Sequence, residues 1–230
     1  VDAPIARLNS QNVVRDADTT AGYRRRHEPP NGRRRSRQTV AMDRTRAFVA
    51  IALPDAVGAS IDALRGGLPA LPRALRWVPV AQAHLTLAFL GDLDDDALTA
   101  VRGAVAASAA ATAPFDASLG GVGAFPHPGR ARVVWAGWRT GAHDVVALHR
   151  TLADALARAI GYRRDPRPFV PHVTIARARE PLDLQACLAP GNAWRGPPWR
   201  VAAVDLMASE LLRTGARHTL LARLPLSGGG

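Results

Sequence analysis

Two short stretches, His84-Leu85-Thr86-Leu87 and His172-Val173-Thr174-Ile175, repeat one pattern of histidine, apolar residue, threonine and apolar residue. Each has the alternation that is typical of a β-strand with one buried face. The histidine and the threonine then share the polar face of their strand, and the apolar pair points into a core. At this composition roughly 0.08 such tetrapeptides are expected by chance, so the repeat indicates a shared role.

The two polar faces carry the groups that phosphodiester hydrolysis needs. One neutral imidazole can accept a proton while one imidazolium donates one, since the usual pKa of histidine, about 6.5, allows both forms near neutrality. The hydroxyls of Thr86 and Thr174 can donate to phosphate oxygens on which negative charge builds. If the strands share a cleft, His84 and His172 are an acid–base pair. The sequence alone does not assign donor and acceptor.

A weaker copy of the pattern, His149-Arg150-Thr151-Leu152, lies inside the most regular predicted helix, residues 143–160. Residues two apart on a helix share no face, so we do not expect this copy to form a site. For His84 and His172 the plain alternative is a hydrogen-bonded core histidine, which fits either motif alone better than it fits the pair.

Apolar spacing and turn residues divide the rest of the chain into strands with interspersed helices, in two rough halves. We expect strands at residues 47–53, 84–90, 115–122, 132–138, 172–177, 201–211 and 219–224, an extended piece at 76–78, and helices at 55–66, 94–107 and 143–160. In the last helix the predicted apolar stripe is Val146, Leu148, Leu152, Leu156 and Ile160.

The net charge of +11 comes from 30 basic residues, all of them arginine. This charge favours polyanions such as RNA, although a codon-biased, solvated surface explains it equally well. Residues 1–41 form an arginine-rich segment without apolar periodicity, which we expect to be disordered. It is an RNA-binding arm, an upstream extension or a cloning remnant. Residues 42–230 are expected to form a single domain.

Several classes of protein are excluded by simple counts. Cys187 is the one cysteine, so no intrachain disulfide forms and a zinc finger is not expected. No apolar stretch of about 18 residues predicts a membrane span, and residues 1–40 lack the apolar centre of a secretory signal. We expect a cytoplasmic protein. Since no carboxylate or cysteine cluster accompanies the motif histidines, we expect no metal and no other cofactor.

At these motifs the sequence resembles the 2H phosphoesterases, in the bacterial branch called RNA 2′,3′-cyclic phosphodiesterase or 2′-5′ RNA ligase. The resemblance covers residues 44–226 and extends beyond the histidine motifs. It includes Arg46-Ala47-Phe48-Val49-Ala50-Ile51, Trp77-Val78, Gly123-Ala124-Phe125-Pro126, Arg132-Val133-Val134-Trp135-Ala136-Gly137 and Phe169-Val170-Pro171 before the second motif. One departure is His218, where members often have an aromatic residue.

The resemblance implies an α+β, bilobal fold in which two small antiparallel sheets face each other across a central cleft, with helices on the outer faces. It implies hydrolysis of an RNA 2′,3′-cyclic phosphate end, as on tRNA fragments, to a 2′-phosphate by a monomer. His84 would be the proton donor and His172 the acceptor, with phosphate contacts from Thr86, Thr174 and Arg177. On strict strand alternation Arg177 points away from His172, so a strand end or bulge must place it.

Two aromatic residues are candidates for stacking on a base, Phe48 in the first strand and Phe125 in a turn-rich loop. Core packing is the alternative for each. Two other functions remain open on the sequence. One is the activity of the same superfamily on 2′-5′ linkages, by ligation or cleavage. The other is a non-catalytic RNA-binding module, which would not need paired acid and base residues.

Overall fold

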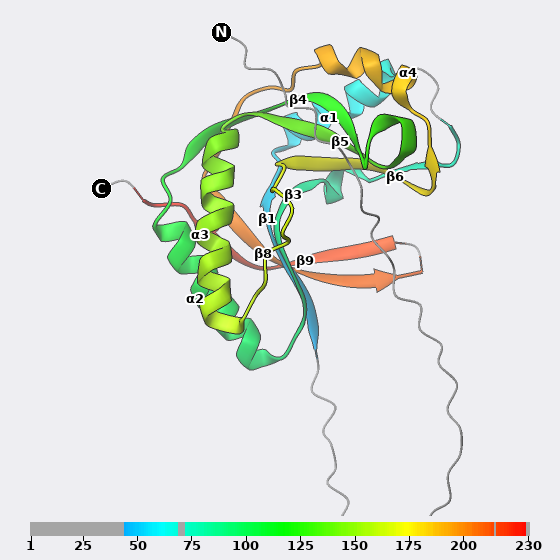
Figure 1. Ribbon diagram of the computed structural model, residues 1–230. Helices are drawn as coiled ribbons and strands as arrows, with labels where there is room; N and C mark the ends of the chain where they lie inside the picture. Colours follow the sequence, from blue (N-terminus) through cyan, green and yellow to red (C-terminus); the bar gives the residue numbers. More distant parts are fainter. Residues whose placement is uncertain (1–43, 69–71, 214, 229–230) are drawn as a thin grey trace, which may run out of the picture. The chain divides into compact units, whose positions relative to one another are not determined.

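Helices and 3-10 turns are interspersed among the strands in the part of the chain that the computed structural model describes, residues 44–68, 72–213 and 215–228 (Figure 1). The strands are β1 (Thr45–Ala52), β2 (Leu75–Trp77), β3 (His84–Leu93), β4 (Phe115–Phe125), β5 (Ala131–Thr140), β6 (His172–Leu182), β7 (Trp199–Val201), β8 (Ala203–Leu212) and β9 (Gly215–Pro225). The helices are α1 (Asp55–Gly67), α2 (Asp95–Ala110), α3 (Ala142–Ile160) and α4 (Gln185–Leu188), with 3-10 turns η1 (Val80–Gln82), η2 (Pro128–Arg130) and η3 (Ala189–Ala193).

Every strand and helix predicted from the sequence is present in the described part. The helix α4, the short strand β7 and the 3-10 turns were not predicted, because each is too short to show a period. The predicted disordered segment, residues 1–41, lies outside the described residues.

All nine strands belong to one curled antiparallel sheet in the order β7-β4-β5-β6-β3-β1-β8-β9, with β2 paired to β6. The α+β class is therefore confirmed, but the strands do not form two separate sheets. We call β1, β3, β8 and β9 the His84 half, and β2, β4, β5, β6 and β7 the His172 half. The halves meet at a single registered pair, Leu85 and Val173, which joins the two motif strands at the centre of the sheet.

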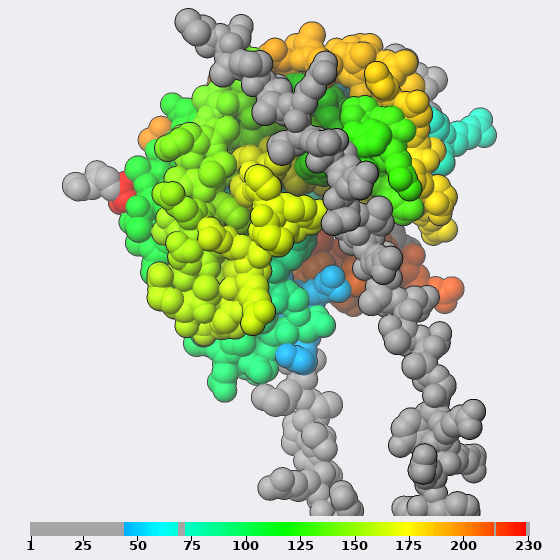
Figure 2. Space-filling view, viewed as in Figure 1, coloured from blue at the N-terminus to red at the C-terminus, as the bar shows by residue number. Residues whose placement is uncertain are grey.

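Helices cover the sheet because its apolar face needs a partner. α2 and α3 lie side by side against the His84 half, where α2 contacts β1, β3, β8 and β9. Figure 2 shows their side chains as one continuous surface. On α3 the buried stripe includes Val145, Leu148, Leu152 and Leu156, whereas Val146 is exposed. The prediction was right for Leu148, Leu152 and Leu156 and wrong for Val146, because Val146 is two residues from Leu148 and so lies off its face, which Val145 shares instead.

Among the described residues, no helix is both long enough and apolar enough to cross a membrane.

Candidate active site

The two motif histidines stand on neighbouring antiparallel strands. Because Leu85 is paired with Val173, the next positions of the register place His84 beside Thr174 and Thr86 beside His172. The apolar motif residues are buried and the polar ones are half-buried on the other face. The two histidines are therefore diagonal neighbours, which in an antiparallel pair are about 7–8 Å apart and within joint reach of one small group.

Each histidine is held by the same hydrogen bond. Nδ1 of His84 lies 2.8 Å from the carbonyl oxygen of Gln82, and Nδ1 of His172 lies 2.7 Å from that of Val170. A carbonyl oxygen can only accept, so Nδ1 carries the proton in both rings. Nε2 is then the atom that exchanges protons. A neutral ring presents a lone pair there, and a protonated ring presents an N–H.

The site favours neutral imidazoles. Burial lowers the pKa of His84, the Gln82 carbonyl opposes this, and His218 and Arg177 lower the pKa further. Burial also lowers the pKa of His172, against the Val170 carbonyl, and Arg177 again lowers it. Arg177 thus acts on both histidines, while His218 acts on His84. A bound phosphate anion would counter these effects by favouring the protonated form.

A β-bulge interrupts each motif strand at the same place. On β3 the register with β1 shifts so that Leu87 is the extra residue, and on β6 the register with β5 shifts so that Ile175 is. Leu87 and Ala88 are consequently both buried, as are Ile175 and Ala176. From His84 to Asp92 and from His172 to Glu180 the sequence of buried, half-buried and exposed residues is identical.

The bulges decide which later side chains reach the catalytic face. After two consecutive buried residues, alternation resumes one position late, so Arg177 emerges on the face of His172 and Thr174. This bulge is the irregularity that the sequence analysis required to place Arg177 on the same face as His172. The corresponding residue on β3 is Phe89, which is 70% exposed. Phe89 was missed from the sequence, because an exposed phenylalanine in an apolar strand gives no signal until the bulge is known.

Aromatic rings surround each histidine. Phe48 stacks on His84 with ring centroids 4.9 Å apart, and His218 meets both rings edge-on at 4.9 Å from Phe48 and 5.4 Å from His84. Phe48 is only 3% exposed, so its ring packs on His84 and leaves little room for a base. On the other half Phe125 lies edge-on to His172 at 5.0 Å and is half-buried at the end of β4.

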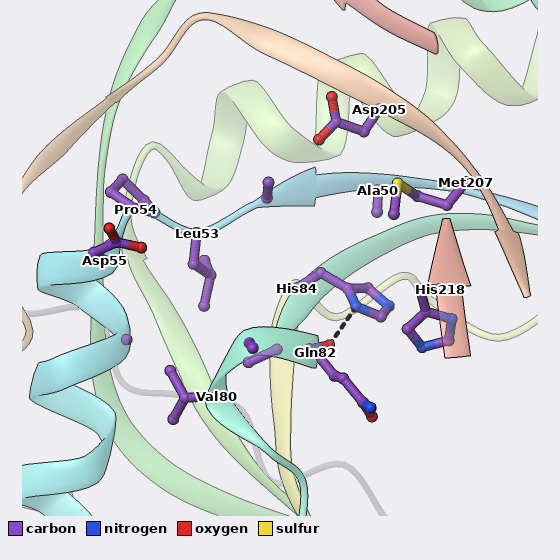
Figure 3. A pocket seen from close by; sticks show the side chains of 14 residues that line it. Ala50, Leu53, Pro54, Asp55, Val80, Gln82, His84, Asp205, Met207 and His218 are labelled. Atoms are coloured by element: carbon purple, nitrogen blue, oxygen red, sulfur yellow. Dashed lines mark hydrogen bonds between the residues drawn. The ribbon is translucent and has the colours of Figure 1, made fainter. Parts of the chain in front are cut away.

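A cavity of about 300 Å³ opens beside His84, on the side of the 3-10 turn η1 (Figure 3). Leu53, Val80 and Met207 give it apolar walls, and Gln82, Asp205 and His218 bring polar groups to it. Asp205 is 4% exposed and accepts two hydrogen bonds from Arg223, at 2.8 and 2.9 Å. His218 and Gln82 were not predicted as site residues, since β9 and η1 reach His84 only through the fold.

The motif hydroxyls and the possible metal ligands are the remaining polar groups of the site. Within the described ranges neither Thr86 nor Thr174 has a hydrogen-bond partner for its side chain, which leaves both hydroxyls available to a ligand. In the same ranges no group of three or more histidine, cysteine, aspartate or glutamate side chains could hold a metal ion.

The chain is similar in sequence and in fold to proteins of known description. Residues 53–211 match the family model of the 2′-5′ RNA ligase superfamily. An RNA 2′,3′-cyclic phosphodiesterase of Geobacillus stearothermophilus is 35% identical over 59% of the chain and 43% of its own length. One of Escherichia coli is 33% identical over 79% of the chain and 97% of its length. The crystal structure of E. coli LigT complexed with 3′-AMP aligns at a TM-score of 0.68 and 30% identity, over 80% of the chain and 99% of LigT.

Proposed function

The chain belongs to the 2′-5′ RNA ligase superfamily, and we propose that it is an RNA 2′,3′-cyclic phosphodiesterase that opens cyclic phosphate ends to 2′-phosphates. The observation that carries the proposal is the diagonal placement of two histidines whose Nδ1 atoms are both fixed by carbonyl oxygens. Both Nε2 atoms are thereby free to exchange protons over one phosphate. Relatives with the same printed activity support the choice of substrate.

The reaction is a displacement at phosphorus that needs one base and one acid. In our proposal Nε2 of His172 takes a proton from water, whose oxygen forms the new bond to phosphorus. The bond to O3′ breaks, and O3′ takes a proton from Nε2–H of His84. Thr86, Thr174 and Arg177 donate to the non-bridging oxygens, where charge builds. The products are a 2′-phosphate and a 3′-hydroxyl.

The position of the cavity supports His84 as the proton donor. The leaving oxygen O3′ belongs to the ribose of the terminal nucleoside, so that nucleoside lies on the side of the donor. Water attacks in line from the opposite side. The cavity of about 300 Å³ borders His84 and offers apolar walls with a few polar groups, which is the usual lining of a small-molecule site. The donor assignment thus has support besides the family resemblance.

A second candidate function is the use of a 5′-hydroxyl in place of water, which would make or, in reverse, break a 2′-5′ linkage. The same four motif residues would serve, and the description of the matching family favours keeping this candidate. A non-catalytic RNA-binding module is disfavoured, because binding alone gives no reason for two matched imidazole tautomers.

The decisive experiment supplies the full chain with nucleoside 2′,3′-cyclic phosphates and with 2′-5′-linked dinucleotides, in EDTA, and identifies products by ³¹P NMR. We expect 2′-phosphates from the cyclic substrates and slower cleavage of the 2′-5′-linked dinucleotides. Turnover of the dinucleotides alone would transfer the assignment to the second candidate. Activity that EDTA abolishes and a divalent ion restores would overturn the two-histidine mechanism.

Further proposals concern the surroundings of the site. We propose that the His84 half and the His172 half act as two lobes with the RNA end between them, and that a cytoplasmic monomer suffices. We also propose that residues 1–41 are an arm outside the catalytic domain, 42–230. Removing residues 1–40 should leave turnover of a mononucleotide unchanged and weaken the salt dependence of binding to long RNA, because nine arginines are lost. Loss of mononucleotide turnover would place the arm in the site.

A further inference from the structure

The extra residue of each bulge has a backbone carbonyl that accepts a hydrogen bond from a group outside the strand opposite the bulge. The extra residue of a bulge is unpaired with the partner strand, and a buried carbonyl without a donor is costly. Here the two extra residues are Leu87 on β3 and Ile175 on β6, both buried. At each place a donor other than the strand opposite the bulge supplies the hydrogen bond that the buried carbonyl needs.

Ile175 receives its donors from α1 and from the residue after β2. The backbone N–H of Val78 donates to its carbonyl oxygen at 2.9 Å, and the guanidinium of Arg65 reaches the same oxygen at 3.4 Å. Arg65 also donates to the carbonyl of Val78 and lies over the ring of Trp77, 5.0 Å from its centroid. Its side chain is only 14% exposed. Val78 and Arg65 thus together hold the bulge that brings Arg177 to the face of His172 and Thr174.

Leu87 receives its donor from α3. Nδ1 of His149 lies 2.9 Å from the carbonyl oxygen of Leu87, so this ring also carries its proton on Nδ1. Strand β6 cannot supply the donor, because extending the register from Leu85 and Val173 places Leu87 opposite Pro171, which has no N–H. The imidazole stands where the ladder between the two motif strands ends.

His149 also contacts the chain that leads into the second motif. Its ring stacks on Phe169, with centroids 3.9 Å apart and planes 10° from parallel. Phe169 precedes Pro171 and His172. One side chain of α3 therefore holds the first motif strand by a hydrogen bond and the approach to the second by stacking. Burial lowers the pKa of His149, against the Leu87 carbonyl, and Arg164 lowers it further, so a neutral ring is favoured.

We propose that His149 is a positioning residue for the reaction, the counterpart on the first motif strand of Arg65 on the second. It fixes the bulge at Leu87 and ties the two motif strands together beyond their single registered pair. The proposal rests on the proposed function for its effect on turnover. Its expected size follows from the sensitivity of catalysis to misplacement, where an error of about 1 Å can cost about 10²-fold.

Two substitutions of His149 distinguish the effect of its Nδ1–H hydrogen bond from the effect of its stacked ring. His149→Phe keeps a ring that can stack on Phe169 and removes the donor, whereas His149→Asn places an amide N–H where Nδ1 was and removes the ring. We expect His149→Phe to lower kcat by about tenfold or more with little change in KM, and His149→Asn to restore most of the loss. His143→Phe, on the exposed side of the same helix, is the matched control and should behave as the unaltered chain.

Equal kcat values for His149→Phe, His143→Phe and the unaltered chain would overturn the proposal. If His149→Phe does not fold, His149→Ala against His149→Asn makes the same comparison, and equal kcat values there would also overturn it. The ring signals of His84 in NMR spectra provide a readout that needs no turnover. They should move in His149→Phe and not in the control, even if the unaltered chain proved inactive on cyclic phosphates and the proposed function failed.

Discussion

The His84 half and the His172 half use one strand design with different surroundings. Each motif strand has a histidine locked through Nδ1 to the carbonyl two residues earlier, a half-buried threonine, and a bulge at the fourth motif residue. A helix side chain reaches each bulge carbonyl: His149 donates to that of Leu87, and Arg65 reaches that of Ile175 beside the Val78 N–H. Beyond these features the halves differ. A cavity and His218 border His84, while Phe125 and Trp135 border His172.

This difference bears on the proposed roles of the two histidines as proton donor and proton acceptor. The strands alone would give two interchangeable histidines, since both rings present Nε2 in the same way. In our proposal the cavity makes the His84 side suitable for a nucleoside and leaves the His172 side for water. On this proposal the shared strand design supplies two equivalent histidines, and the unequal surroundings assign one as proton donor and the other as acceptor.

The largest expected effect comes from removing either histidine. His84→Ala and His172→Ala should each lower kcat on a cyclic mononucleotide by about 10²–10⁴-fold, because a positioned acid or base contributes that much. Exposed His127 offers a control, and His127→Ala should change nothing. Circular dichroism checks that each variant folds. A loss of only a few-fold in one motif variant would break the comparison, since that half would then not take part in proton transfer.

The next effect concerns the residues that the bulges bring to the catalytic face, Arg177 and Phe89. Arg177→Met should lower kcat/KM by about 10²-fold, because one donor to a developing oxyanion is lost. Phe89→Met should have a much smaller effect on a mononucleotide, since Phe89 offers no hydrogen bond to phosphate. Steady-state kinetics of the two variants side by side measure the contrast. Equal losses in the two variants would show that the bulges matter for the shape of the strands and not for the chemistry of the side chains that they bring to the catalytic face.

The sequence predicted the α+β class, the three longer helices, the strands other than β7, and the placement of the two histidines close together, because period and motif are local signals. It did not predict that the motif strands are neighbours in one sheet, since strand pairing depends on contacts far apart in the chain. The sequence also contains no signal for the bulges at Leu87 and Ile175. A prediction made without the bulge at Ile175 therefore pointed Arg177 away from His172. Phe48 was a stacking candidate, but its burial against His84 is set by β8 and β9.

The threonines test whether the motifs are equivalent towards the phosphate. Thr86→Val and Thr174→Val keep the shape and remove the hydroxyl, and a hydrogen bond to a charged group is worth about 1.5–3 kcal/mol. Each variant should therefore lose about 10- to 150-fold in kcat/KM on a cyclic mononucleotide, since each 1.36 kcal/mol is tenfold in rate. Similar losses would sharpen the comparison, since the two hydroxyls lie beside the opposite histidines. If one variant kept full activity, the phosphate would be bound by one half alone.

The smallest expected effect tests the division of roles itself, through His218. His218→Phe keeps an aromatic ring against Phe48 and removes an imidazole that lowers the pKa of His84 and has no part in that of His172. The pKa of His84 should therefore rise, and that of His172 should stay unchanged, which NMR titration of the ring protons measures directly.

The effect on the rate depends on which histidine is the donor. The productive form of the enzyme has the donor protonated and the acceptor neutral, and the limbs of the pH profile belong to the coupled pair. A higher pKa on the donor increases the productive fraction, while a higher pKa on the acceptor decreases it. If His84 is the donor, kcat/KM at its optimum should rise by less than about tenfold in this variant, since one pKa unit corresponds to tenfold. A fall at the optimum, with the pKa of His84 raised as expected and binding of the 2′-phosphate product unchanged, would exchange the roles of the two histidines.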